Sequence, residues 1–198
     1  MYTSLPETIQ QELIHLTAQY GQPITRTYDL ASDGNFEPVN KKDRYGEVCM
    51  VVRRPNGRLL TMIKTYYPAN AYRLLTGGIN HDEFVFDALL RETAEETGLE
   101  VTVERFLASA AYHLPHTGPN PVFFTFAFLL QEVGGSLETI DEEEQVEDFR
   151  EIEVSELPAI ADRLDQLATT PEYSNTEWGD WGKFRAIMHR LTWESLQN

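Results

Sequence analysis

The chain lacks the features that mark secreted and membrane proteins. Its 198 residues include a single cysteine, Cys49, so no disulfide can form within the chain. The longest apolar run, VFFTFAFLL from Val122, is too short to cross a bilayer. The N-terminus has no basic start followed by an apolar stretch, as a secretory signal would. We therefore expect a cytoplasmic protein with no membrane segment.

Basic residues are also scarce. The chain has 16 Lys and Arg against 32 Asp and Glu, which gives a formal net charge of -16. Because Lys and Arg contacts hold a nucleic-acid backbone, this charge argues against long DNA or RNA as a partner. The remaining composition, 41% hydrophobic and 24% charged, is typical of a globular protein that buries a core. The length fits one domain with additions.

The most informative segment is 77–99, GGINHDEFVFDALLRETAEETGL. On a helix, Glu92, Glu95 and Glu96 stand at i, i+3 and i+4, so three carboxylates project from one face. Like charges this close destabilise a helix unless a cation compensates them. Carboxylate oxygens suit Mg²⁺ or Mn²⁺ rather than zinc. A solvated acidic face is the alternative for such a cluster.

A fixed frame around these glutamates favours the metal site. The frame consists of Gly77, Glu83, Arg91, Glu92, Glu95, Glu96 and Gly98. At these positions the chain resembles the Nudix hydrolases, whose box reads Gly, five residues, Glu, seven residues, Arg-Glu, a bulky aliphatic, one residue, Glu-Glu, one residue, Gly and an aliphatic. Thr93 departs from the pattern, because the family usually has a bulky aliphatic there. Asp82 and Leu75 replace a frequent glycine and a frequent proline, neither of them at a metal or catalytic position.

The resemblance implies both a fold and a reaction. The fold is of the α/β class, an α/β/α sandwich with a mixed sheet, here with an N-terminal helix extension and a C-terminal helix. The reaction is Mg²⁺-dependent hydrolysis of a diphosphate (P–O–P) bond in a small nucleoside diphosphate derivative, such as ADP-ribose, a nucleotide sugar or a nucleoside triphosphate. The alternative is a Nudix-fold nucleotide-binding or regulatory domain that does not cut its ligand. Intact box carboxylates favour the enzyme, a Nudix pyrophosphohydrolase.

The resemblance also assigns roles within the box. The implied metal ligands are Glu92, Glu95 and Glu96. Glu95 is either the third ligand or the base that deprotonates water, and Glu92 is the other catalytic candidate, so the general base stays open. The structural positions of the box are Gly77, Glu83, Arg91 and Gly98. We expect Glu83 and Arg91 to pair and to hold the box loop.

An acidic segment, 138–156, offers one further carboxylate. Nudix enzymes commonly recruit such a group after the box, and the sequence FREIEVSELP, which fits the strand and helix start usual there, points to Glu143 or Glu144. Glu144 is our candidate for the extra ligand or base, and the choice between the two stays open. A solvated loop is the expectation for the other acids.

Signals for the rest of the substrate lie before the box. Lys64 and Arg73 are candidates to contact phosphate oxygens. Tyr72, together with Tyr66 and Tyr67, surrounds the same loop and is a candidate to bind the substrate by stacking a base. Simple packing at a sheet edge is the alternative for each tyrosine.

Hydrophobic periodicity gives the expected order of elements. We expect helices at 6–20, 83–97, 156–167 and 183–196, and strands at 24–30, 45–54, 58–66, 73–75, 101–112, 122–133 and 149–154. Two units follow from this order: a helix and strand extension over 1–40, and a Nudix domain with C-terminal helices over 41–198.

The box helix has recognisable ends. Asp82 is expected to cap its N-terminus, and Gly98 suits a left-handed residue at its C-terminus. The stripe expected to seat the helix on a sheet is Phe86, Leu90 and Thr93, with Val85 and Leu89 beside them.

An aromatic segment near the C-terminus has no assigned role. It spans 171–184, PEYSNTEWGDWGKF, and is expected to be an irregular loop. Its aromatic side chains would pack on the core, close over the site, or be buried at a homodimer contact. The N-terminal extension is the other place where we expect a dimer contact.

Overall fold

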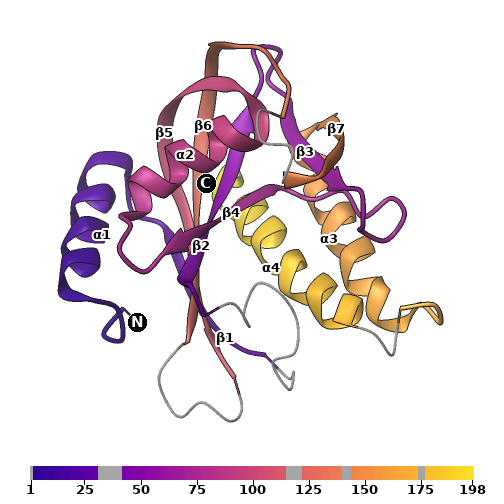
Figure 1. Cartoon of the computed structure of the whole chain (residues 1–198), viewed down its shortest axis with the longest axis horizontal. Coiled ribbons are helices and arrows are strands. Elements are labelled where there is room, and N and C mark those ends of the chain that lie inside the picture. The colour runs from indigo at the N-terminus through magenta and orange to yellow at the C-terminus, as the bar shows by residue number, and fades with distance from the viewer. Residues whose placement is uncertain (1, 31–41, 115–121, 140–143, 174–176) are drawn as a thin grey trace.

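A mixed sheet lies between two helical layers (Figure 1). The computed structural model describes residues 2–30, 42–114, 122–139, 144–173 and 177–198. The helices are α1 (Glu7–Tyr20), α2 (Val85–Thr97), α3 (Leu157–Gln166) and α4 (Glu177–Gln197), with short 3₁₀ turns at Val154–Glu156 and Leu167–Thr169. The strands are β1 (Ile24–Asp29), β2 (Arg44–Arg53), β3 (Leu59–Lys64), β4 (Leu75–Asn80), β5 (Leu99–His113), β6 (Phe123–Gly135) and β7 (Val146–Ile152).

The seven strands form one sheet in the order β1-β5-β6-β2-β3-β7, with β4 paired to β2 beside this row. The pairs β1 with β5 and β2 with β6 are parallel, and the others are antiparallel. Strands β3 and β4 share one edge of β2, because residues 44–50 pair with β4 and Arg53 pairs with β3. The ends of β3 and β4 therefore reach the same region of the molecule.

Both faces of the sheet are buried. In β2, Cys49 and Val51 belong to the core cluster beneath α3 and α4, whereas Val48, Met50 and Val52 belong to the cluster beneath α1 and α2. Figure 1 shows these two helix pairs on opposite sides of the sheet. An apolar strand whose alternate residues enter two cores is buried on both sides. The predicted α/β/α sandwich with a mixed sheet is confirmed.

None of the helices in the described residues combines the length and the apolarity that a membrane span requires.

The start of α2 differs from the prediction. Its N-cap residue is Phe84, and the expected cap by Asp82 is wrong. The free N–H groups of Val85 and Phe86 instead donate to the carboxylate of Glu12 in α1, at 2.9 and 2.8 Å. A side chain 73 positions away in sequence thus satisfies the helix start, which local spacing did not indicate. Helix α1 itself begins after Pro6 and ends at a glycine, as predicted.

The other end of α2 matches the prediction, and its buried face matches in part, because Val85, Leu89 and Thr93 are buried as expected. Gly98 ends the helix with φ 65°, in the left-handed region. Leu90, expected in the seating stripe, is 38% exposed, and Phe86 stacks on Tyr20 of α1. Thr93 is buried, and its hydroxyl donates to the carbonyl of Leu89 at 2.6 Å, so the helix itself satisfies this polar group.

The buried face of α2 consists of Val85, Ala88, Leu89, Glu92, Thr93, Glu96 and Thr97. Two glutamates of the box therefore face the sheet, where we had expected them to flank the apolar stripe. Their burial makes any charge that they carry costly unless it is compensated.

Two strand boundaries also differ. Strand β4 covers 75–80 and includes Gly77 of the box and its neighbour Gly78, whereas Arg73 forms only an isolated bridge to Met62. Strand β7 begins at Val146, three residues earlier than predicted.

Helix α4 begins at Glu177, six residues before the predicted start. Residues 177–184, within the segment expected to be a loop, form its first part. Gly182 in this part serves close packing, because a Cβ there would overlap the carbonyl of Leu164 in α3. Trp181 and Phe184 from this segment are buried in the core.

Candidate active site

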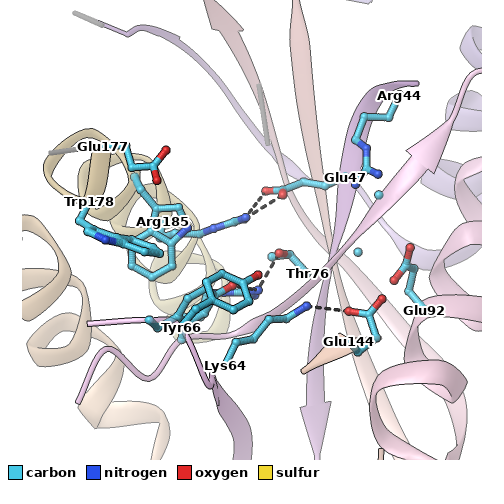
Figure 2. A pocket seen from close by; sticks show the side chains of 15 residues that line it. Arg44, Glu47, Lys64, Tyr66, Thr76, Glu92, Glu144, Glu177, Trp178 and Arg185 are labelled. Carbon is cyan, nitrogen blue, oxygen red and sulfur yellow. Dashed lines mark hydrogen bonds and ion pairs between the residues drawn. The ribbon is translucent and has the colours of Figure 1, made fainter. Parts of the chain in front are cut away.

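A cavity of about 250 Å³ separates the N-terminal part of α4 from the box carboxylates (Figure 2). Its basic lining residues are Arg44, Lys64, Arg73 and Arg185. Its acidic lining residues are Glu47, Glu92, Glu144 and Glu177. A quarter of the chain's 16 Lys and Arg therefore gathers around one cavity, although the net charge is -16. This mixture suits an anionic ligand that binds together with a cation.

Glu92 lies across the backbone of β4. A Cβ on Gly77 would overlap the Glu92 carboxylate, so a side chain at this position would displace Glu92. The Oε1 atom of Glu92 accepts a hydrogen bond from Nη1 of Arg91 at 2.8 Å. Burial raises the pKa of Glu92, and Arg91 offsets only part of that effect. Gly77 and Glu92 thus fit together at the edge of the cavity.

Glu96 is completely buried. Neither of its carboxylate oxygens has a hydrogen-bond partner among the described residues. The nearest compensating charge is the Nζ of Lys64, 3.4 Å from Oε1. Burial raises the pKa of Glu96 to about 7, against the pull of Lys64 and Arg73. A buried carboxylate without hydrogen bonds to either oxygen is costly, and a bound cation would reduce that cost.

Lys64 lies between two carboxylates that are far apart in sequence. Its Nζ donates to Oε2 of Glu144 at 2.6 Å, and it also faces Glu96. Burial alone would lower the pKa of Lys64, but the Glu96 carboxylate raises it, and the net shift is upward. For Glu144, burial raises the pKa, but the hydrogen bond from Lys64 and its charge outweigh it, and the net shift is downward. Both groups are therefore charged at neutral pH.

Arg91 joins the other carboxylates of the box. Its Nε and Nη2 donate to the two oxygens of Glu83 at 2.7 and 2.8 Å. Nη1 donates to Glu92 and, at 2.9 Å, to Glu95. Nη2 also donates to the carbonyl of Gly78, which ties α2 to β4. The structure thus places Arg91 and Glu83 in the bracing arrangement that the sequence suggested.

Lys64 and Arg91 pair with the carboxylates that would otherwise be available to a metal ion. In the part of the chain that the structure describes, no three Asp, Glu, His or Cys side chains converge closely enough to hold a metal ion. Lys64 lies between Glu96 and Glu144, and Arg91 holds Glu92. The donors nevertheless fit a hard divalent cation, because they are all carboxylates and neither oxygen of Glu96 has a hydrogen-bond partner among the described residues.

Three of the predicted metal-binding, catalytic and substrate-binding residues, Glu95, Glu96 and Tyr72, lie outside the cavity lining, and Glu96 is buried behind it next to Lys64. The Glu95 side chain is 37% exposed and faces Arg91. The Tyr72 hydroxyl donates to Oδ2 of Asp148 at 2.5 Å, away from the cavity. Glu143, the alternative to Glu144, lies outside the described residues.

Arg73 lines the cavity, but its donors are engaged. Nε and Nη2 donate to the hydroxyl of Tyr67 at 3.1 and 2.7 Å. Nη1 donates to the carbonyl of Leu74 and to Oγ1 of Thr76. In this state the guanidinium holds the protein around the cavity together, and four of its five N–H groups already have protein partners.

A buried ion pair at the cavity was not predicted from the sequence. Nη1 of Arg185 in α4 donates to both carboxylate oxygens of Glu47 in β2 at 2.8 Å, and Thr125 donates to the same carboxylate (Figure 2). The Nε of Arg185 is buried without a partner among the described residues. A lone glutamate inside the apolar strand 45–52 was the available signal for Glu47. No such sequence signal marked Arg185, because it is one of several basic residues along α4.

Comparison with known proteins adds a family match and distant relatives. Residues 44–173 match the family model described as a NUDIX domain. The chain is 27% identical over 114 residues to the NAD-capped RNA hydrolase NudC of Stutzerimonas stutzeri, covering 58% of this chain and 38% of that protein. It is 29% identical over 111 residues to the ADP-ribose pyrophosphatase of Methanocaldococcus jannaschii, covering 56% of this chain and 63% of that protein. The chain thus spans less than two thirds of either relative.

Among solved structures, the chain is similar to an ADP-ribose pyrophosphatase from Streptococcus suis. The TM-score is 0.46 and the sequence identity 18%, with 77% of this chain and 92% of the other covered.

Proposed function

The chain belongs to the Nudix family, and from this premise we propose that it hydrolyses the diphosphate (P–O–P) bond of a small nucleoside diphosphate derivative. The proposed metal is Mg²⁺, with Mn²⁺ as the alternative. ADP-ribose is the first compound to test, because two of the similar proteins are ADP-ribose pyrophosphatases. Nucleotide sugars and nucleoside triphosphates follow. The small cavity favours such compounds over a polymer.

The observation that carries this proposal is the state of Glu96. It is fully buried, both of its oxygens lack hydrogen-bond partners in the described structure, and it belongs to the box spacing. A purely structural glutamate at such a site would be expected to have satisfied oxygens. A cation held by Glu96 and Glu92, with Glu144 as the added ligand, would supply the missing partner.

Each carboxylate has a proposed task. When bound, Mg²⁺ offsets phosphate charge and lowers the pKa of a coordinated water. Glu92 and Glu96 hold the cation, with Glu95 as the outermost candidate ligand. Either Glu92 or Glu144, both of which line the cavity, accepts the proton of the attacking water at a carboxylate oxygen. Lys64, once released from Glu144, is free to donate to a phosphate oxygen.

The direct test is a panel of nucleoside diphosphate derivatives incubated with Mg²⁺, with release of monophosphate or phosphate measured. We expect at least one compound to be cut, and Glu96→Gln to lower kcat/KM by about a hundredfold or more, since even outer-shell partners of metal ligands contribute 10–100-fold. The matched control is Glu104→Gln, which removes a carboxylate paired with Arg53 at the surface. This control should keep full activity.

The same panel addresses the alternative function. If nucleotides bind but none is cut under any metal condition, the chain is a nucleotide-binding or regulatory domain and the proposal is wrong. Equal turnover by the wild type and Glu96→Gln would also contradict it.

A further inference from the structure

The cavity wall formed by α4 is aromatic. Trp178 in the first turn of α4 and Tyr66 after β3 have ring centroids 6.4 Å apart, with their planes inclined by 36°. Both residues line the cavity, and Tyr66 is 49% exposed. Figure 2 shows the two rings on the side of the cavity opposite Glu92. We call Trp178 and Tyr66 the aromatic wall.

A second layer of side chains supports this wall from behind. Tyr67 lies 5.8 Å from Trp178 and 4.8 Å from Trp181, measured between ring centroids. The Tyr67 hydroxyl accepts two hydrogen bonds from Arg73, which is itself fully buried. Aromatic rings held in this way lose little conformational freedom when a ligand stacks on them.

The position of the wall relative to the carboxylates is also fixed. The ion pair between Arg185 and Glu47 ties α4 to β2 beside the cavity. Close packing at Gly182 holds the same part of α4 against α3. A ligand that reaches the carboxylates with its phosphates therefore meets the wall with its organic part.

This deepens the proposed function, on which it rests: we propose that Trp178 and Tyr66 stack the base of a nucleotide substrate, and that Glu177 selects bases carrying an exocyclic amino group. Every base offers a flat π face to an aromatic side chain, and such stacking contributes to affinity whatever the base. Selection requires a polar group beside the rings. Glu177 lines the same cavity, and a carboxylate only accepts hydrogen bonds. Adenine presents an amino donor to it, and uracil presents a carbonyl in the corresponding place.

The stacking part is tested by binding, without turnover. Calorimetric titration of the metal-chelated wild type should show AMP binding about tenfold or more tighter than ribose 5-phosphate, since a stacked base typically contributes that much or more. Trp178→Ala should remove the difference, and Trp178→Phe should keep most of it. The control is Trp193→Ala, because Trp193 lies elsewhere on α4 and does not line the cavity. Equal affinities of the wild type for AMP and ribose 5-phosphate would overturn the stacking proposal without any variant.

The selection part is tested by the ratio of AMP to UMP affinity. We expect the wild type to favour AMP, and Glu177→Gln to reduce the preference several-fold, because an amide can also donate to a carbonyl. The matched control is Asp180→Asn, which changes an acid of the same first turn outside the cavity lining. An AMP preference that survives Glu177→Gln unchanged would refute the role of Glu177.

These outcomes are separate from those of the proposed function. If AMP binds through Trp178 but no diphosphate is cut, the base site stands and the hydrolase proposal fails. If diphosphates are cut at the same kcat/KM whatever their base, and also by Trp178→Ala, the hydrolase stands and the base site is wrong.

Discussion

At the scale of single residues, Lys64 is the side chain that would compete most directly with a metal ion for the carboxylates. Its ammonium contacts Glu144 and faces Glu96, two of the proposed ligands. In the absence of metal it compensates part of their charge. A cation bound between these carboxylates would take over that role and release the lysine. Lys64 therefore connects the stability of the metal-free protein to its affinity for the metal.

We predict that Lys64→Met destabilises the metal-chelated protein by about 3 kcal/mol, because it leaves buried carboxylates without their partner. The same variant should gain more stability from added Mg²⁺ than the wild type does. Thermal unfolding with and without Mg²⁺ measures both effects. The control is Lys183→Met, which removes a solvent-exposed lysine paired with Asp180. An identical Mg²⁺-induced shift of Tm in Lys64→Met and the wild type would show that Lys64 does not compete with the metal.

The three glutamates of the box helix differ in their surroundings. Glu92 and Glu96 are buried, whereas Glu95 is partly exposed and pairs with Arg91. We predict that Glu95→Gln lowers kcat less than Glu92→Gln or Glu96→Gln does. Turnover at saturating Mg²⁺ measures the order. A larger loss of kcat in Glu95→Gln than in the other two variants would contradict this order. It would identify Glu95 as the base, with its side chain in another position than beside Arg91.

At the scale of elements, His189 joins α4 to the start of β4. Its Nε2 accepts the backbone N–H of Leu74 at 3.0 Å, and its Nδ1 donates to the carbonyl of Arg185 at 2.9 Å. This arrangement requires the neutral ring. Burial lowers the pKa of His189 to about 4, from an ordinary value of 6.5. Protonation would remove the acceptor for Leu74 and place a charge in the core.

The pH dependence follows from that lowered pKa. The stability contributed by the neutral ring is fully present above pH 6.5 and is lost as the pH falls towards 4, because only the unfolded chain takes up the proton in that range. The loss amounts to about 3 kcal/mol. We predict that His189→Gln, which can keep both hydrogen bonds, loses stability less steeply between pH 7.5 and pH 4. Urea unfolding of metal-chelated protein at both pH values measures this, and parallel curves for the variant and the wild type would contradict it.

Elements were predictable where local chemistry decides them. The spacing of the box predicted α2, and Gly98 predicted its end. The start of α2 was not predictable, because its cap comes from Glu12 on another helix. The start of α4 could not be predicted for a different reason. Gly179 and Gly182 read locally as loop residues, but they allow the helix to pack closely against neighbouring backbone.

At the scale of the whole molecule, the box predicted the carboxylates on one side of the cavity but not the residues of α4 on the other side. Glu92 and Glu96 share one helix, so their spacing alone brings them together. Glu47, Trp178 and Arg185 meet only through the packing of α4 on the sheet. Long-range packing of this kind leaves no local pattern, which explains why Tyr72 was chosen as a substrate contact and Trp178 was not.

The central claim is that the box carboxylates direct a water molecule to a phosphorus of a nucleoside diphosphate derivative. The most direct measurement is hydrolysis in ¹⁸O-labelled water with Mg²⁺, followed by mass spectrometry of the products. Cleavage of a P–O–P bond predicts one ¹⁸O atom in one of the two phosphate-containing products, with labelled product formed about a hundredfold or more slowly by Glu96→Gln. Unlabelled phosphate groups, or label in the products of Glu96→Gln at the wild-type rate, would contradict the claim.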